Sequence, residues 1–114
     1  MSTQIDAIED FVKEFKAHDL KGIRTHLHVD YSWIDQTGAV VVQGPENFLN
    51  LIEGLWKENP KLSISNSPCI QVGNLVSHTE TIVGYEDGHK EEYIWVYEFK
   101  GNVIVKMFGF QSAI

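Results

Sequence analysis

One carboxylate stands out among the residues of this chain that could take part in chemistry. Asp35 ends the run 27–35, whose aromatic and β-branched residues favour a β-strand. An acid at that place in a small α+β fold can point into an interior pocket, where apolar walls raise the pKa of a carboxyl group and suit it to general acid–base catalysis. The alternative is that Asp35 only caps a turn with Thr37 and Gly38.

A second pair of titratable residues, His78 and Glu80, lies in a segment of strand-like alternation. Residues i and i+2 of a strand share a face, so both side chains point the same way. If that face is inward, the two residues either contact a ligand or form a hydrogen-bonded pair. If it is outward, they belong to a solvated strand surface.

No metal or cofactor is expected from the cysteine and histidine pattern. His26 and His28 are two residues apart, without the carboxylates that would favour a metal site. Cys69 is the only cysteine, which excludes an internal disulfide, and it has no CxxC partner. We expect it to be a small buried side chain rather than a nucleophile.

Length and charge narrow the class of protein. The 114 residues suffice for one domain with one core, and 43% of them are hydrophobic. The formal net charge of -7 disfavours contact with phosphate backbones, so no nucleic-acid partner is expected. No segment is apolar for long enough to cross a bilayer, and the N-terminus lacks signal-peptide features. A cytoplasmic protein with no membrane partner is the default expectation.

The first half of the chain predicts helices. Apolar residues recur on one helical face over 3–17, where Thr3 and Asp6 can form a cap: Ile5, Ile8, Phe11, Val12 and Phe15. A short second helix is predicted over 19–27. A third, Pro45–Lys57, begins with proline, whose missing N–H costs little at the first helical position.

The second half of the chain predicts a sheet. The apolar period changes from 3.6 to 2 after Pro60. Two short strands are predicted before Pro60, at 29–35 and 39–43. Four more follow it, at 62–72 with a break at 66–68, 75–85, 91–100 and 103–111. This order predicts an α+β fold with the helices on the concave face of one curved sheet.

Four local phrases occur in an order and spacing that is typical of one superfamily: Ala17–Ile23, Asp30–Asp35, Gly44–Phe48 and Tyr97–Ile104. The chain resembles the nuclear transport factor 2-like superfamily, and within it the SnoaL-like and ketosteroid isomerase-like groups. The resemblance implies a single SnoaL-like domain over 1–114. It further implies a cystatin-like cone, in which a curved antiparallel sheet wraps around the N-terminal helices and encloses an apolar cavity. The convex side of such a sheet is commonly a homodimer interface.

The resemblance also assigns roles to individual residues. Ketosteroid isomerases use an Asp as general base, and a Tyr with a protonated Asp as oxyanion donors. The base falls on Asp35, five residues after Asp30. The two donor positions fall on Phe11, which has no donor, and on Trp95, whose indole N–H is a partial substitute. Because one lost oxyanion donor costs about 3 kcal/mol of transition-state stabilisation, steroid isomerase activity is not expected.

Strand alternation extends this implication to the cavity wall. The expected catalytic residues are Asp35 and His78. The expected ligand contacts are Phe11, Phe15, Tyr31, Trp33, Trp56, Glu80, Tyr93, Trp95, Tyr97, Phe108 and Phe110. Ungapped pairing of the last strand puts Lys106 inward with Phe108 and Phe110, an assignment that one β-bulge would invert.

Such a wall suits a small, largely apolar ligand with a carbonyl or hydroxyl group. Two functions fit it. One is an enzyme of the isomerase, cyclase or hydrolase type with Asp35 as base, and the other is a non-catalytic ligand-binding or dimerisation module. Outward residues of the same alternation would form the homodimer interface: Thr79, Thr81, Val83, Ile94, Val96, Val105 and Met107.

Overall fold

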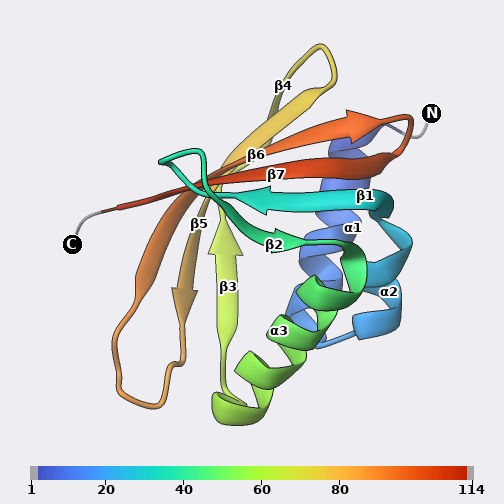
Figure 1. Ribbon diagram of the computed structural model, residues 1–114. Helices are drawn as coiled ribbons and strands as arrows, with labels where there is room; N and C mark the ends of the chain where they lie inside the picture. The colour runs from blue at the N-terminus through green and yellow to red at the C-terminus, as the bar shows by residue number, and fades with distance from the viewer. Residues whose placement is uncertain (1–2, 113–114) are drawn as a thin grey trace.

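The computed structural model describes residues 3–112, which contain three helices and seven strands (Figure 1). Helix α1 (Gln4–Lys16) begins with the predicted capping box. The Thr3 Oγ1 accepts a hydrogen bond from the Asp6 N–H at 3.1 Å, and the Asp6 carboxylate accepts one from the Thr3 N–H at 3.1 Å. These bonds satisfy donors near the N-terminal end of the helix that have no partner inside it. Helix α2 (Leu20–Thr25) follows its N-cap, Asp19.

Helix α3 (Pro45–Glu58) begins with proline as predicted and is followed by its C-cap, Asn59, and by Pro60. Its buried residues, Phe48, Leu49 and Ile52, recur at helical spacing and face the core. None of the helices within 3–112 is both long and apolar enough to span a membrane.

The strands form one mixed sheet. Their bounds are β1 Leu27–Ile34, β2 Val40–Gln43, β3 Ser63–Asn66, β4 Ile70–Val72, β5 Leu75–Val83, β6 Glu91–Lys100 and β7 Val103–Gln111. The order across the sheet is β2-β1-β7-β6-β5-β3, with β4 also paired to β5. The sheet differs from the expected antiparallel one in a single respect, since β1 and β7 run parallel. The predicted strand 62–72 is two short strands, β3 and β4, that pair with different parts of β5.

The core lies between the helices and one face of the sheet. Figure 1 shows the helices together on that side, and one buried cluster joins residues of both long helices to the strands. Its members include Ile8, Phe11 and Val12 of α1, Phe48 and Ile52 of α3, and Val76, Trp95 and Tyr97 of the sheet. The predicted placement of the two long helices on the same face is therefore confirmed.

The inward and outward residues of β7 are the reverse of those predicted. The pairing of β6 with β7 shifts by one residue between Glu98 and Phe99, so that Phe99 pairs with Ile104 and Glu98 with Lys106. Because side chains alternate along a strand, this β-bulge exchanges the two faces beyond it. Met107, expected outward, is buried. The inward assignment of Lys106, Phe108 and Phe110 is wrong, and Phe110 is 43% exposed.

Gly84 is the glycine whose replacement should damage the fold most. Its φ is +94°, and a Cβ there would overlap the Lys61 carbonyl oxygen. Gly88, in the same β5–β6 hairpin, has a φ of +82° but open space around it. We expect Gly84→Ala to lower the free energy of unfolding by about 2–4 kcal/mol, against about 1–2 kcal/mol for the control Gly88→Ala, since both suffer strain at positive φ and only the first adds a backbone clash. Urea denaturation measures both, and equal losses would contradict the predicted contact.

Candidate functional site

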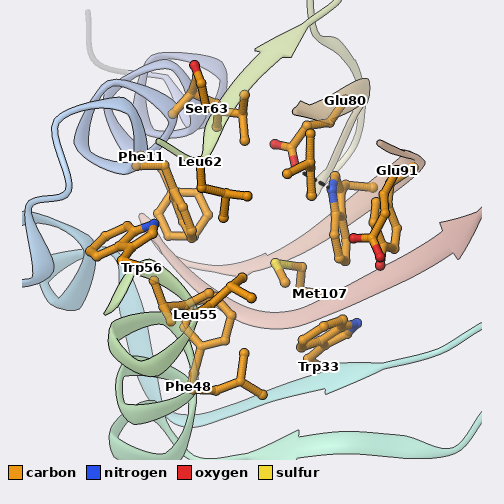
Figure 2. A pocket seen from close by; sticks show the side chains of 18 of the residues that line it. Phe11, Trp33, Phe48, Leu55, Trp56, Leu62, Ser63, Glu80, Glu91 and Met107 are labelled. Carbon is orange, nitrogen blue, oxygen red and sulfur yellow. Dashed lines mark hydrogen bonds between the residues drawn. The ribbon is translucent and has the colours of Figure 1, made fainter. Parts of the chain in front are cut away.

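A cavity of about 110 Å³ lies between α1, α3 and the inner face of the sheet (Figure 2). We call it the aromatic cavity, because rings form much of its wall. All three tryptophans of the chain line it. Of the predicted ligand contacts, its wall includes Phe11, Phe15, Trp33, Trp56, Glu80, Tyr93, Trp95 and Tyr97.

The other predicted contacts lie elsewhere. Tyr31 is fully buried in the core beside the cavity, with its hydroxyl 3.5 Å from the Met107 Sδ and its ring centroid 5.0 Å from that of Phe48. Phe108 and Phe110 are absent from the wall because the β7 bulge turns them to the other side of the sheet. Met107 occupies the wall from β7 instead.

Glu80 brings a carboxyl group to this apolar wall. The Trp95 Nε1–H donates a hydrogen bond to the Glu80 Oε1 at 3.0 Å (Figure 2). Burial raises the pKa of Glu80 to about 7, and the bond from Trp95 offsets only part of that rise. Apolar surroundings penalise the ionised form of a carboxyl group. A carboxyl group that titrates near neutral pH is suited to acid–base chemistry.

A second acid, Glu91, lies in the wall next to the β5–β6 hairpin. The Tyr85 hydroxyl donates to the Glu91 Oε1 at 2.6 Å, and both residues line the cavity. His89 stacks on Tyr85 with ring centroids 4.1 Å apart, and it is hydrogen-bonded to Asp87, which raises the pKa of His89. These contacts hold the hairpin beside the cavity.

His78 points inward as predicted, but it pairs with Tyr97 rather than with a ligand. Its Nε2 is 2.9 Å from the Tyr97 hydroxyl, and its Nδ1 is 3.8 Å from the Cys69 Sγ. Burial lowers the pKa of His78 to about 4, so the imidazole is neutral at neutral pH. His78 is not among the lining residues. The sequence left open whether His78 contacts a ligand, forms a hydrogen-bonded pair or faces solvent. The structure shows a hydrogen-bonded pair, in which the partner is Tyr97 and not Glu80.

Asp35 is not in the aromatic cavity, and its predicted upward pKa shift is wrong. Strand β1 ends at Ile34, and the Asp35 Oδ1 accepts hydrogen bonds from the Thr37 Oγ1 at 2.6 Å, the Thr37 N–H at 2.8 Å and the Ala39 N–H at 3.1 Å. The bonds from Thr37 lower the pKa of Asp35, because they stabilise the ionised carboxylate. The turn-capping interpretation therefore describes its geometry.

Gly109 is a wall-shaping residue that the sequence pattern did not reveal. It lies opposite Trp95 in the β6–β7 ladder. A Cβ at this position would lie 2.5 Å from the Trp95 Cζ3 and 3.1 Å from the Trp33 Nε1. Glycine thus gives these two indoles room to pack edge to face with centroids 5.6 Å apart. Its role depends on the bulge-shifted register, which has no signal in the sequence.

The histidines near the α2–β1 junction contact other residues of the chain. The His26 Nε2 is 2.7 Å from the Glu14 Oε1, and the His28 Nδ1 accepts a hydrogen bond from the Asp30 N–H at 2.9 Å. Within residues 3–112, no group of three or more His, Cys, Asp or Glu side chains is arranged to hold a metal ion.

We expect Asp35→Asn to destabilise the fold at neutral pH, because the amide is a weaker acceptor in the turn. The pKa of Asp35 lies below its ordinary 3.8, so its contribution to stability is present above that value and is lost as the pH falls through the lowered pKa. The urea midpoint of the variant should lie below that of the wild type at neutral pH, and the gap should close as the pH falls below the ordinary 3.8 and through the lowered pKa of Asp35. Asp10→Asn, at an exposed position on α1, is the control. A variant as stable as the wild type at neutral pH would contradict the capping role.

Comparison with known proteins agrees with this architecture. The family model described as the SnoaL-like domain matches residues 8–107. A search of curated proteins gives no match. Among solved structures, an uncharacterised cystatin-fold protein from Novosphingobium aromaticivorans superposes with a TM-score of 0.87 at 17% identity, over 96% of this chain and 98% of that one.

Two further structures are similar over nearly the whole chain. A nuclear transport factor 2-like protein of unknown function from Cytophaga hutchinsonii gives a TM-score of 0.81 at 14% identity, covering 98% of this chain and 92% of its own. IdmH from Streptomyces antibioticus, a proposed polyketide cyclase, gives a TM-score of 0.83 at 14% identity, covering 97% of this chain and 93% of its own. At these identities the similarity concerns the fold alone. The family match spans most of the chain, and the protein therefore belongs to the SnoaL-like domain family.

Proposed function

We propose that the protein binds a small, largely apolar molecule in the aromatic cavity and that Glu80 exchanges a proton with it. The observation that carries this proposal is a carboxyl group with a pKa of about 7 in a wall of aromatic and aliphatic side chains. Apolar walls with few polar groups orient a ligand through those groups. Glu80 takes the acid–base role that the sequence had suggested for Asp35.

The size of the cavity supports a ligand, or an inserted part of one, of about one ring. Its volume of about 110 Å³ is somewhat below that of an apolar cavity of about 150 Å³ that accommodates benzene, so one ring is the upper limit for the enclosed part of a ligand. Proton transfer to such a ligand would suit isomerisation, cyclisation or hydrolysis. The similarity to IdmH, a proposed polyketide cyclase, is in keeping with the second of these classes.

A non-catalytic binding module is the second candidate, and a specific observation favours it. Three polar groups near Glu80 are already engaged: Trp95 bonds to Glu80 itself, Tyr85 to Glu91, and Tyr97 to His78. Such a module would hold its ligand through shape and a single polar contact. Both candidates place the ligand against Glu80, and they differ in whether the replacement of Glu80 abolishes turnover or only weakens binding.

The titration of Glu80 gives the first test. Because all three tryptophans line the cavity and Trp95 bonds to Glu80, tryptophan fluorescence should change with a midpoint near pH 7. Glu80→Gln should remove this transition, while the matched exposed variant Glu53→Gln should retain it. A transition that survives in Glu80→Gln would contradict the assignment.

Glu80→Gln should also change how the stability of the fold depends on pH. The pKa of Glu80 is raised above its ordinary 4.5, so its favourable contribution is present below that value and is lost as the pH rises through about 7. Glu80→Gln should therefore be more stable than the wild type above neutral pH, and its advantage should shrink in acid. Urea unfolding at several pH values checks the sign.

We further propose that the outer face of β5, β6 and β7 forms a homodimer interface, as the family resemblance led us to expect. Ile94 and Phe110 are paired across β6 and β7 and are 50% and 43% exposed. Val83, on β5, is also exposed. Apolar groups gathered on an uncovered face mark an interaction surface. A cytoplasmic location stays a prediction from the sequence.

Light scattering tests this interface. We expect a species of twice the 13.0 kDa chain mass, and Ile94→Asp should convert it to the monomer, because the dimer would bury the new charge. Val29→Asp places the same charge on an exposed residue of β1 away from the patch and should leave the dimer intact. A wild-type protein of 13.0 kDa in dilute solution would refute the proposal.

A further inference from the structure

We propose that the ligand of the aromatic cavity is a small apolar amine, held in its ammonium form against Glu80. This inference rests on the ligand binding in the proposed function, since it names the chemical class of the molecule that the same cavity binds; in that complex Glu80 is the ionised partner of the ligand and not its proton donor. It differs from the carbonyl or hydroxyl ligand that the sequence suggested.

The charges of the wall are all of one sign. Glu80 and Glu91 are its two carboxylic acids, and no Lys, Arg or His lines the cavity within residues 3–112. The lining residues from α1 and α3 are entirely apolar or aromatic. The formal net charge of the chain is -7. A ligand with a carboxylate or phosphate would add a further negative charge to this site, whereas a cation would complement it.

The second carboxylate oxygen of Glu80 can accept a hydrogen bond from a ligand. Its Oε1 receives the Trp95 indole N–H, and its side chain forms no other hydrogen bond and no ion pair with residues 3–112. Within residues 3–112 neither oxygen of Glu80 is among the buried side-chain atoms without a hydrogen-bond partner, so its second oxygen is not sealed inside the protein. An N⁺–H donor from a ligand would satisfy this oxygen with a charge-assisted bond.

Aromatic rings share the cavity wall with this carboxylate. Tyr93 stacks on Trp95 with centroids 4.6 Å apart and planes 14° apart, and Trp33 meets Trp95 edge to face. Figure 2 shows Glu80 and Glu91 together on the sheet side of the cavity, across from Trp56 of α3. The faces of such rings carry negative electrostatic potential and attract ammonium groups. Rings and carboxylates together form a cation-recognition wall, with apolar space beyond it for the rest of the ligand.

The titratable groups that face Glu80 determine how the binding of an amine should depend on pH. They are Tyr85 of the hairpin and Glu91, Tyr93 and Tyr97 of β6, and none of them supplies a positive charge. Glu80 must lose its proton to pair with an ammonium, so the affinity for an amine should increase as the pH rises through about 7. An alkylammonium stays charged to about pH 10. A neutral ligand that accepts a hydrogen bond from protonated Glu80 would show the opposite trend.

Three probes of similar size, with one phenyl ring each and different polar ends, test the inference: 2-phenylethylamine, 2-phenylethanol and phenylacetate. Tryptophan fluorescence reads their binding directly, since every tryptophan of the chain lines the cavity. At about pH 8 we expect the amine to bind at least tenfold more tightly than phenylacetate, and about tenfold more tightly than it binds at about pH 6. Glu80→Gln should reduce the affinity for the amine to that of the alcohol, and Glu53→Gln, an equal loss of charge on the exposed face of α3, should not.

The outcomes separate this inference from the proposed function. If the alcohol binds and the amine binds no more tightly, the amine assignment is overturned and the proposed cavity function stands. If affinity for the amine falls as the pH rises, the amine assignment is likewise overturned. If none of the three probes binds, both proposals fail. The pH dependence of binding to the wild-type protein distinguishes these outcomes even where Glu80→Gln does not fold.

Discussion

The register between β6 and β7 is the constraint on which the cavity depends. One additional residue in β7, opposite the step from Glu98 to Phe99, exchanges the two faces of the rest of that strand. It brings Met107 into the wall and puts Gly109 opposite Trp95. Without the bulge, Phe108 would face the helices and Met107 the outer surface. The missing side chain of Gly109 leaves the space in which Trp95 and Trp33 meet, and the position of Trp95 in turn brings its indole N–H to Glu80.

The raised pKa of Glu80 follows from this arrangement, because its surroundings penalise a negative charge. A carboxyl group among aromatic rings loses the hydration that stabilises its charge, and one indole N–H replaces only part of it. The result is an acid with a pKa of about 7 in a wall that contains no basic residue among 3–112. Proton exchange with a ligand and recognition of an ammonium both draw on this one property. The first uses the change of charge near neutral pH, and the second uses the ionised form.

Two groups that looked suited to catalysis are engaged in hydrogen bonds within the protein, each in a different setting. Asp35 accepts three hydrogen bonds in the turn after β1, and these stabilise its ionised form and keep it outside the cavity. His78 is buried and neutral, and it is bonded to the hydroxyl of Tyr97. The match of Asp35 to the base of ketosteroid isomerases rested on its spacing from Asp30, and spacing along the chain does not specify the direction of a side chain at a strand end.

The sequence by itself determined the helices, most strand bounds and the side of the sheet that the helices cover. These features depend on local properties: the Thr3 cap, the proline that begins α3, the glycines of the turns and the period of the apolar residues. It also placed Glu80 and Trp95 on the inner face, because the pairing of β5 with β6 has no bulge and side chains alternate strictly along it. Only the tertiary structure decided the parallel pairing of β1 with β7, the bulge in β7 and the turn geometry of Asp35. Each of these depends on contacts between segments far apart in the chain or on hydrogen bonds in a specific turn. A one-residue shift in the register of two strands reverses which side chains meet, although the amino-acid pattern of each strand stays the same.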